Sequence, residues 1–435
     1  MLNFIEHYAH PFKVQGGIME APLTRAKLGE ICLIQTDTVS DTWRRGQVIG
    51  FKPGCAILSL FDDGQGLNGQ SRVYPTGQPL CIEIGEHSLG SIYNGAGELC
   101  ARMVPESPPG QARFITQWRA VDNPVVDPLR RQPITQPFYS GVRTIDGLMT
   151  CSKGQRVGIF AAAGAGKSSL LHSLLLRDSA EVIVIALIGE RGREVQDFIQ
   201  HGLNPAQRMK TVVVFATSDA PPIERKNAAL VAMTIAEYFR DAGCEVLLLM
   251  DSITRYARAI REVGFAAGEP VATSGFPASV FAELPRLLER AGPGTENGVI
   301  TAFFTILLES QQGHDAIGEE VRSILDGHIY LSTKLAAANH YPAIDVLNSL
   351  SRLFSRITSP QQQQTAGILR RALQRLDEVQ LLLELGEYQT GNDRFTDKVI
   401  EHKATLLAFL QQTSDECEEP AITLEKMQHV AKSFS

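Results

Sequence analysis

Short β-rich runs separated by turn clusters occupy the first hundred residues of the chain. The runs cover residues 30–35, 46–51 and 55–60, and the clusters at 52–54 and 62–66 combine glycine with proline or aspartate. Regular short strands between such turns are typical of a small barrel. We therefore predict an all-β domain over residues 1–100.

From about residue 138 the pattern changes to apolar strand-like runs that alternate with helical segments. These runs are 157–160, 182–188, 211–216, 246–250 and 299–308. Near-continuous apolar strands are typical of a parallel sheet that is buried on both faces. Ligands of such sheets bind at the carboxyl ends of the strands. The polar residues that follow the runs there are Glu190, Ser218, Asp219, Asp251 and Glu309.

A helical pattern replaces the strands beyond about residue 358 and predicts a small helical domain over 359–435. Ser359 as N-cap, Pro360 at the first helical position and Gln362 two residues later indicate a helix start, and Gly386 is its expected C-cap. Further helices are expected at about 397–412 and 424–433. The proline-rich residues 104–137 predict an ordered connector, so that 101–358 holds the connector and the α/β domain.

Composition indicates a globular protein of the reducing cytoplasm. The 435 residues are 44% hydrophobic and 20% charged, and the net charge of -7 provides no basic footprint for nucleic acid or anionic lipid. No apolar run reaches membrane-spanning length, and the first ten residues do not resemble a signal peptide. The seven cysteines never form CxxC, which favours reduced thiols over disulfides or a zinc site.

The stretch RVGIFAAAGAGKSSLLHSLLL, residues 156–176, carries the clearest chemical signal. A short strand enters a small-residue loop, and a helix follows Lys167 and Ser168, which is the pattern of a phosphate-binding loop. Glycines allow successive backbone N–H groups to cradle phosphate, the lysine reaches the β- and γ-phosphates, and the serine hydroxyl binds Mg²⁺. The alternative is a Gly/Ala-rich turn, which has no need of a lysine. The predicted nucleotide contacts are Ala163, Gly164, Ala165, Gly166, Lys167, Ser168 and Ser169.

Two acidic residues at strand ends suit the chemistry of a bound nucleotide. Asp251 ends the run VLLLM and is predicted to join the Mg²⁺ shell, although such an aspartate can also cap the next helix. Glu190, in IGERGREV, is predicted to orient or deprotonate the attacking water. Its alternative role is a helix-start acid paired with Arg191 or Arg193. Arg191 is predicted either to hold the catalytic carboxylate or to reach a phosphate.

Stabilising a transferring phosphoryl group also requires a positive charge. Arg352 has no obvious route to the phosphate loop of its own chain, but a neighbouring subunit could present it as an arginine finger. From spacing alone, a surface salt bridge is the alternative.

Six segments of the chain together resemble one family, the catalytic ATPases of type III protein secretion systems. These ATPases are relatives of the flagellar export ATPase and of the catalytic subunit of the rotary ATP synthase. The resemblance covers about residues 20–412. The segments are GIFAAAGAGKSSL, IGERGREV, LLLMDSITRYARAIREV, GFPASVFAELPRLLERAG, EEVRSILDGHIYLS and NHYPAIDVLNSLSR.

The resemblance implies a P-loop (RecA-like) parallel-sheet core between an N-terminal β-barrel that mediates oligomerisation and a C-terminal helical domain that contacts chaperones and substrates. It further implies a homohexamer with ATP at subunit interfaces, and it assigns the finger role to Arg352. Tyr341 lies where some relatives stack adenine on an aromatic residue; the alternative is a core tyrosine before Pro342. The implied function is that of an ATP-hydrolysing motor that releases chaperones and feeds secreted proteins into the export apparatus.

The family works with a central stalk, a peripheral regulator, the export gate, and chaperones with their effectors, at the cytoplasmic face of the inner membrane. Two features depart from its pattern. Ala161 replaces the first glycine of the loop, and Ser274 and Phe276 replace an expected arginine and tyrosine, so the role of that second loop stays open. The alternatives are a flagellar export ATPase, a Rho-like nucleic-acid translocase and a non-catalytic subunit. The translocase needs a basic or aromatic platform on the N-terminal domain, which has Trp43-Arg44-Arg45 but no larger basic cluster.

Overall fold

The computed structural model describes residues 8–36, 43–105, 113–177, 179–308, 315–391 and 393–434. The chain forms two compact units, each built from segments far apart in the sequence. The first combines residues 1–131 with 181–298, and the second combines 132–180 with 299–435.

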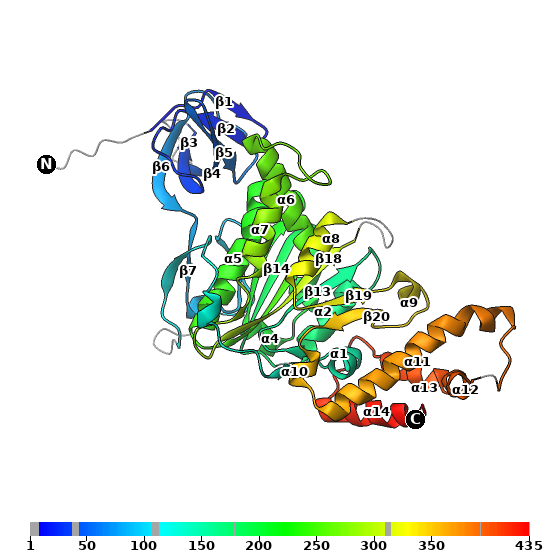
Figure 1. Cartoon of the computed structure of the whole chain (residues 1–435). Helices are drawn as coiled ribbons and strands as arrows, with labels where there is room; N and C mark the ends of the chain where they lie inside the picture. The colour runs from blue at the N-terminus through cyan, green and yellow to red at the C-terminus, as the bar shows by residue number, and fades with distance from the viewer. Residues whose placement is uncertain are drawn as a thin grey trace. The chain divides into compact units, whose positions relative to one another are not determined.

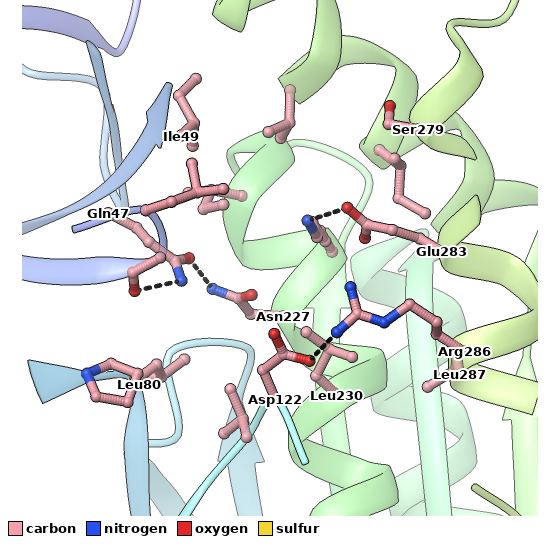
Figure 2. Close-up of a pocket in the computed structure, with 18 of the residues that line it drawn as sticks. Gln47, Ile49, Leu80, Asp122, Asn227, Leu230, Ser279, Glu283, Arg286 and Leu287 are labelled. Atoms are coloured by element: carbon pink, nitrogen blue, oxygen red, sulfur yellow. Dashed lines mark hydrogen bonds and ion pairs between the residues drawn. The ribbon is translucent and has the colours of Figure 1, made fainter. Parts of the chain in front are cut away.

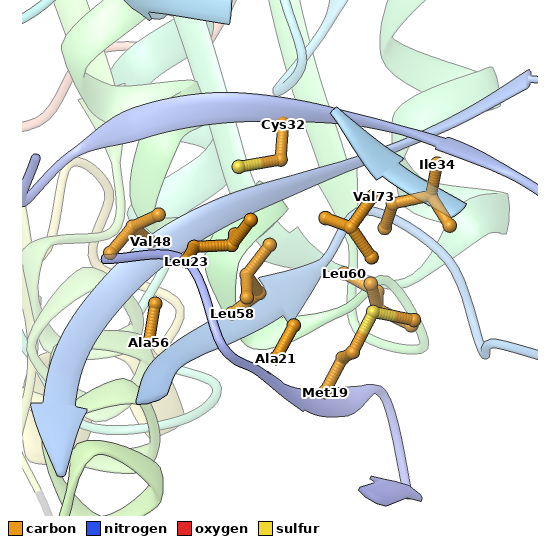
Figure 3. Close-up of a cluster of buried hydrophobic side chains, with 10 residues drawn as sticks. All are labelled: Met19, Ala21, Leu23, Cys32, Ile34, Val48, Ala56, Leu58, Leu60 and Val73. Carbon is orange, nitrogen blue, oxygen red and sulfur yellow. The ribbon is translucent and has the colours of Figure 1, made fainter. Parts of the chain in front are cut away.

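A six-stranded sheet of neighbours β1-β2-β5-β4-β3-β6 forms the N-terminal part of the first unit. Its strands are β1 Lys13–Gln15, β2 Ile18–Ala21, β3 Glu30–Gln35, β4 Trp43–Lys52, β5 Cys55–Leu60 and β6 Arg72–Pro79. The predicted runs 30–35 and 55–60 are confirmed to the residue, and 46–51 lies inside β4. Alternate side chains of these strands meet in an apolar cluster that includes Met19, Ile34, Leu58 and Val73 (Figure 3).

The first unit also contains a parallel sheet in the order β16-β14-β15-β8, with β9 antiparallel at its edge. Its strands are β8 Ser91–Asn94, β9 Leu99–Arg102, β14 Val182–Glu190, β15 Thr211–Thr217 and β16 Glu245–Asp251. β14 is buried along its whole length, as a strand covered on both faces must be. The predicted parallel sheet is confirmed for these runs, and β8 joins it from within residues 1–100.

Helices α5, α6 and α7 lie side by side in this unit, and α5 packs on β14, β15 and β16 (Figure 1). The connector is ordered where it is described: β10 (Gln117–Ala120), inside the proline-rich stretch, pairs with β7 (Cys81–Ile84), which precedes that stretch. The remaining elements are β7 Cys81–Ile84, β10 Gln117–Ala120, α3 Gly192–His201, α4 Pro205–Met209, α5 Pro222–Asp241, α6 Ile253–Ala267, α7 Ala278–Leu288 and β17 Gly292–Pro293.

The second unit contains strands in the order β20-β19-β13-β18, all parallel except the edge strand β20. The run 299–308 is confirmed as a strand, and Glu309 lies outside the described residues. The elements are α1 Arg143–Leu148, β13 Arg156–Ala161, α2 Lys167–Leu176, β18 Val299–Leu307, α8 Ala316–Ile324, β19 Gly327–Leu331, α9 Thr333–Ala337, β20 Ile344–Ser351 and α10 Phe354–Ile357, with the short pair β11 Pro137–Phe138 and β12 Cys151–Ser152.

The C-terminal helices begin as predicted and then depart from the prediction. Ser359 accepts a hydrogen bond from the amide of Gln362, and Gly386 ends α11 (Pro360–Leu385) in the left-handed region. The single helix expected at 397–412 is wrong: it starts earlier and is interrupted at His402, whose ring packs against Phe434. The later helices are α12 Arg394–Glu401, α13 Lys403–Leu410 and α14 Pro420–Lys432, the last starting four residues before the predicted limit.

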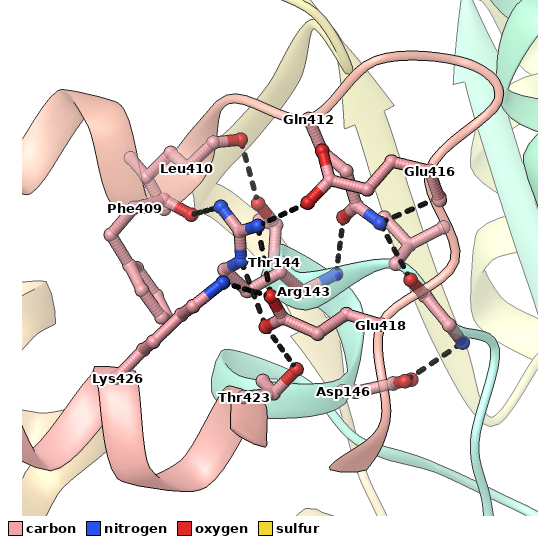
Figure 4. Close-up of polar contacts among 12 residues, drawn as sticks. Arg143, Thr144, Asp146, Phe409, Leu410, Gln412, Glu416, Glu418, Thr423 and Lys426 are labelled. Atoms are coloured by element: carbon pink, nitrogen blue, oxygen red, sulfur yellow. Dashed lines mark hydrogen bonds and ion pairs between the residues drawn. The ribbon is translucent and has the colours of Figure 1, made fainter.

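Arg143, the first residue of α1, joins the second unit's α/β part to its C-terminal helices (Figure 4). Its buried guanidinium donates to both carboxylate oxygens of Glu418, at 3.0 and 3.1 Å, and to Glu416 at 2.7 Å. It also donates to the carbonyls of Phe409 and Gln411. Because a buried guanidinium is costly unless its donors are satisfied, this network fixes the segment 409–418 on α1.

Candidate functional site

The phosphate loop joins β13 to α2 in the second unit, as the sequence predicts. Gly164 and Gly166 have φ of 79° and 85°, a left-handed conformation that strongly favours glycine. Ala161, by contrast, is the last residue of β13, in register with Leu307 and Leu331. Its extended conformation explains why alanine is tolerated where the family pattern has glycine.

Lys167 and Ser168 form the first turn of α2, whose N-cap is Gly166. Glycine has no side chain to cap the turn, so the helix start presents backbone donors and the positive end of the helix dipole. Ser168 and Ser169 are exposed, as are Ala163 and Gly164, while Ala165 is buried. The loop therefore offers backbone groups and a hydroxyl to a ligand of phosphate type.

Tyr341 lies directly against this loop, although the two are far apart in sequence. A Cβ added at Gly166 would lie 3.0 Å from Cε1 of the Tyr341 ring. Both residues line a cavity of about 550 Å³, and residues 411–414 and Glu416 form another of its walls. The amide of Gln412 donates to the carbonyl of Tyr341 at 2.8 Å, which ties that wall to the tyrosine. This half-exposed ring beside the phosphate loop suits a planar base.

Glu190 ends β14 in the first unit and is 4% exposed. Its carboxylate Oε2 lies 3.3 Å from Nη2 of Arg255, on the first turn of α6, and Arg255 also donates to the carbonyl of Gly189. Gly189 is glycine for two reasons: its φ is 65°, and a Cβ there would meet Cδ of Arg255 at 3.0 Å. Arg255 is therefore the cation that holds the glutamate, a role that the sequence analysis did not assign to it.

Arg191 and Arg193 point to other partners. Arg191 lies 3.8 Å from Glu194, and Arg193 lies 3.5 Å from Asp197, all on exposed side chains. These ion pairs give no support to a pairing of Glu190 with either arginine, and the role of Arg191 in holding the catalytic carboxylate stays a prediction. A contact between Arg191 and phosphate stays a prediction.

Asp251 ends β16 at the same edge of the sheet as Glu190. β14 and β16 are parallel neighbours with Leu187 opposite Asp251, so Glu190 lies three residues beyond that register. Asp251 is 7% exposed, and the helix that follows is capped by Ser252, which accepts from the amide of Arg255. The aspartate is thus not the N-cap of α6. Ser218 follows β15 beside them, and its amide donates to the carbonyl of Glu190.

Arg352 follows β20 in the second unit and is exposed. Its amide donates to the carbonyl of Asp326 at 2.9 Å, and its guanidinium Nη2 donates to the carbonyl of Arg322 at 3.3 Å. Burial, together with the charges of Arg322 and Arg352, lowers the pKa of His328 on the neighbouring strand. Among the described residues, the guanidinium is held by a backbone carbonyl and by no acidic side chain, so the surface salt bridge has no support.

The second loop that departs from the family pattern is ordered. Ser274 has φ of 52° and Gly275 of 81°, and the amide of Phe276 donates to the carbonyl of Thr273. The guanidinium of Arg261 lies 5.1 Å from the centre of the Phe276 ring. Phe276 therefore anchors the loop to α6 through a cation–π contact.

Another cavity, of about 460 Å³, lies inside the first unit between the N-terminal sheet and helices α5 to α7 (Figure 2). The amide of Asn227 donates to Gln47 across it at 2.8 Å, and Lys226 pairs with Glu283 at 2.8 Å. The contact between Asn227 and Gln47 connects helix α5 to the N-terminal sheet, and the pair of Lys226 and Glu283 connects α5 to α7. The cavity contains none of the predicted site residues.

The donor set fits a nucleotide with a hard cation. Serine hydroxyl and aspartate carboxylate oxygens are ligands that Mg²⁺ prefers. Among the described residues, no group of three or more histidines, cysteines or acids is arranged to hold a metal by itself. No helix in the described part of the chain is long and apolar enough to cross a membrane.

The strand, left-handed loop and helix define a P-loop nucleotide-binding protein. Three family models agree with this class: the ATP synthase alpha/beta nucleotide-binding domain over residues 141–351, the beta-barrel domain of the same family over 12–77, and the type III secretion ATPase C-terminal domain over 358–429. The chain belongs to the family of type III secretion system ATPases.

Relatives and solved structures agree with that assignment. The SPI-1 type 3 secretion system ATPase of Salmonella typhi is 46% identical over 94% of both chains. The assembled ATPase EscN of enteropathogenic E. coli matches with a TM-score of 0.89 at 41% identity, over 97% of this chain and all of that one. EscN in complex with its central stalk EscO matches over the same shares, also at 41% identity, with a TM-score of 0.85.

The flagellar alternative has less support. The flagellum-specific ATP synthase of Bacillus subtilis is 38% identical over 98% of this chain and 95% of its own, below the secretion ATPase. The chain is therefore an ATPase of type III secretion, with an N-terminal β-barrel, a central α/β nucleotide-binding domain and a C-terminal helical domain.

Proposed function

We propose that the chain hydrolyses ATP with Mg²⁺ as a homohexameric motor of type III secretion, with each site completed by a residue of the adjacent subunit. The observation that carries this proposal is the phosphate loop itself, with two left-handed glycines and the Tyr341 ring against Gly166, in a chain of this family. We assign the domains to residues 1–100, 101–358 and 359–435.

The phosphate loop binds the triphosphate in this proposal. Backbone groups of residues 163–166 and 169 cradle the phosphates, Lys167 contacts the β- and γ-phosphates, and Tyr341 stacks on adenine. Ser168 and Asp251 hold Mg²⁺, partly through water. When bound, the cation neutralises charge that develops on the phosphate oxygens.

Glu190 orients the attacking water and accepts its proton. Its burial beside Arg255 supports this role, because the ion pair fixes the carboxylate in one orientation. Arg191, whose side chain is exposed, contacts phosphate. Arg352 of the adjacent subunit stabilises the transferring phosphoryl group, and its exposed position at the end of β20 supports a role towards another chain.

The partners follow from the family. EscN was solved with its central stalk EscO, and we propose an equivalent stalk here. A peripheral regulator, the export gate, chaperones and their effectors complete the set, at the cytoplasmic face of the inner membrane. The motor releases chaperones and feeds secreted proteins into the apparatus. No nucleic acid takes part.

The test is ATP turnover per chain as a function of protein concentration, with and without single-stranded RNA, for the parent chain and Arg352→Ala. We expect a rate that rises with concentration, ignores RNA and falls by about 10³-fold in the variant, as arginine fingers do. A concentration-independent rate that survives the substitution would refute the shared site. Strong stimulation by RNA would instead support the translocase.

A further inference from the structure

A buried glutamine connects the strand that leads into the phosphate loop with the residue next to Arg352. Gln155 is 0% exposed and immediately precedes β13. Its Oε1 accepts from the amide of Ser152 at 2.8 Å, and its Nε2 donates to the carbonyl of Asp326 at 3.0 Å and to Oγ of Ser351 at 3.1 Å. Both donors and the acceptor of the amide are therefore used inside the protein.

Gly327 provides the space that this contact needs. A Cβ at Gly327 would lie 2.9 Å from Nε2 of Gln155 and 2.9 Å from the carbonyl oxygen of Leu350. Its φ is not in the left-handed region, so glycine is required here for close approach and not for conformation. A side chain at this position of β19 would therefore displace the Gln155 amide.

Asp326 connects Gln155 to the backbone of Arg352. Its carbonyl accepts from Gln155 Nε2 and from the amide of Arg352 at 2.9 Å. Its carboxylate accepts from Nε and Nη2 of Arg156 at 2.9 and 3.1 Å, a bidentate pair that fixes the aspartate on β13. The backbone at Arg352 is thus fixed by two hydrogen bonds: one from its own amide to Asp326, and one from Gln155 to the side chain of the preceding residue, Ser351.

We propose that Gln155 is a positioning residue for Arg352. Gln155 fixes the backbone from which the guanidinium of Arg352 extends. The strand that leads into a subunit's phosphate loop therefore also orients the arginine that this subunit contributes to the site of the adjacent subunit. This inference rests on the proposed action of Arg352 across the subunit interface. Small errors in the placement of a charged group lower turnover steeply, because its interaction with the transferring phosphoryl group depends on distance.

A mixing experiment separates this role from a general effect on the subunit's own site. Gln155→Met subunits, which keep an intact phosphate loop, are assembled with Lys167→Ala subunits, which are inactive but carry an intact Gln155 and Arg352. We expect Gln155→Met alone to lose about 10- to 100-fold in kcat, with the Kd for ATP unchanged within about twofold. An excess of Lys167→Ala subunits should then restore turnover at the Gln155→Met sites.

The reference mixture is Arg352→Ala with Lys167→Ala. If Arg352→Ala is rescued and Gln155→Met is not, the glutamine acts on its own site and the inference is overturned, while the shared site stands. If neither is rescued, the action of Arg352 across the interface is refuted, and the inference with it.

Two further variants protect the test against misfolding. Ser351→Ala removes only the hydroxyl that Gln155 contacts, and a smaller loss of kcat, rescued in the same mixture, is expected. Gln362→Met removes another buried amide, one that donates to Thr150 and to carbonyls of α1. Gln362→Met should leave kcat within about twofold of the parent value. A loss of kcat equal to that of Gln155→Met would mean that removing any buried side-chain amide lowers turnover, and would overturn the proposal.

Discussion

Arg255 holds the carboxylate of Glu190: Nη2 of the arginine lies 3.3 Å from Oε2 of the glutamate, and the glutamate is almost fully buried. Arg255→Met removes the positive charge from a buried carboxylate and frees its orientation. We expect kcat to fall by about 10- to 100-fold, since general-base catalysis contributes about 10²- to 10⁴-fold. The KM for ATP should change little, because the contacts of Arg255 are with the Glu190 carboxylate and the carbonyl of Gly189.

Arg193→Met is the matched control, because that exposed arginine lies near the same strand end but pairs with Asp197. It should leave kcat unchanged in a steady-state assay. Equal losses in the two variants would show that positive charge near the strand end, and not the ion pair with Glu190, sets the rate.

Gly166→Ala is expected to weaken nucleotide binding for two separable reasons. The left-handed φ of 85° penalises any side chain by about 1–2 kcal/mol, and the new methyl group meets the Tyr341 ring at 3.0 Å. Titration with a fluorescent ATP analogue should show Kd at least about tenfold weaker. In a Tyr341→Ala background the added cost should be smaller by about 1 kcal/mol, a coupling of the size that touching residues show. If the effects of the two substitutions on Kd are additive, the Tyr341 ring moves away from the added methyl group without an energetic cost.

Tyr341→Ala alone should weaken ATP binding through the loss of stacking. Aromatic stacking on a base is worth about 1–3 kcal/mol, so Kd should rise by about 5- to 150-fold. Tyr341→Phe keeps the ring and should bind ATP nearly as well as the parent chain. Inorganic triphosphate has no base, and its competition for the site should be the same in all three proteins. A matching loss for triphosphate would indicate a purely structural tyrosine.

Glu418→Gln should remove stability that depends on pH. Burial acts to raise the pKa of Glu418, but hydrogen bonds from Arg143, Lys426 and Thr423 outweigh it and lower the pKa to about 2. Because the folded pKa is depressed below the ordinary 4.5, the ionised carboxylate stabilises the fold above about pH 4.5. That contribution, about 3 kcal/mol at about 1.4 kcal/mol per tenfold change in proton affinity, is lost as pH falls from about 4.5 to about 2.

Urea denaturation of the parent chain and the variant between pH 2 and pH 8 measures this difference. The gap in unfolding free energy should be constant above pH 5 and close at low pH. The buried Asp146, whose pKa desolvation raises to about 6, works in the opposite sense, since its neutral form favours the fold as pH falls below 6. It is present in both proteins and cancels in the comparison. A pH-independent gap would refute the electrostatic account.

The strands that the sequence predicted are apolar runs bounded by polar or turn residues, whereas β8, β19 and β20 were not predicted. The limits of β3 and β5 are matched to the residue, and those of β14 and β16 within two. The phosphate loop was predictable for a similar reason, since its chemistry is local in the sequence. The break at His402, whose ring packs against the distant Phe434, was not predicted. The start of α14 was missed although Pro420 at the first helical position signals it.

Contacts between distant segments account for what the sequence did not reveal about the site. Arg255 lies in a quoted motif, four residues after Asp251, yet nothing in its spacing indicates that it contacts Glu190. Likewise, the approach of Tyr341 to Gly166 and the bond between Gln155 and Ser351 join residues about 170 to 200 positions apart. Such pairs are set by tertiary packing and not by local pattern.

The wall formed by residues 411–416 has a practical consequence for dissecting the protein. A fragment that stops at Thr358 would retain the whole phosphate loop, yet it would lack one side of the cavity beside Tyr341 and the acidic partners of Arg143. The helical domain thus forms part of the wall of the cavity in which we propose that nucleotide binds. A deletion of this domain that is made to test the proposed contact with chaperones is therefore expected to change the affinity for nucleotide as well. Point substitutions at exposed positions of α11 and α12 are the better way to test that contact alone.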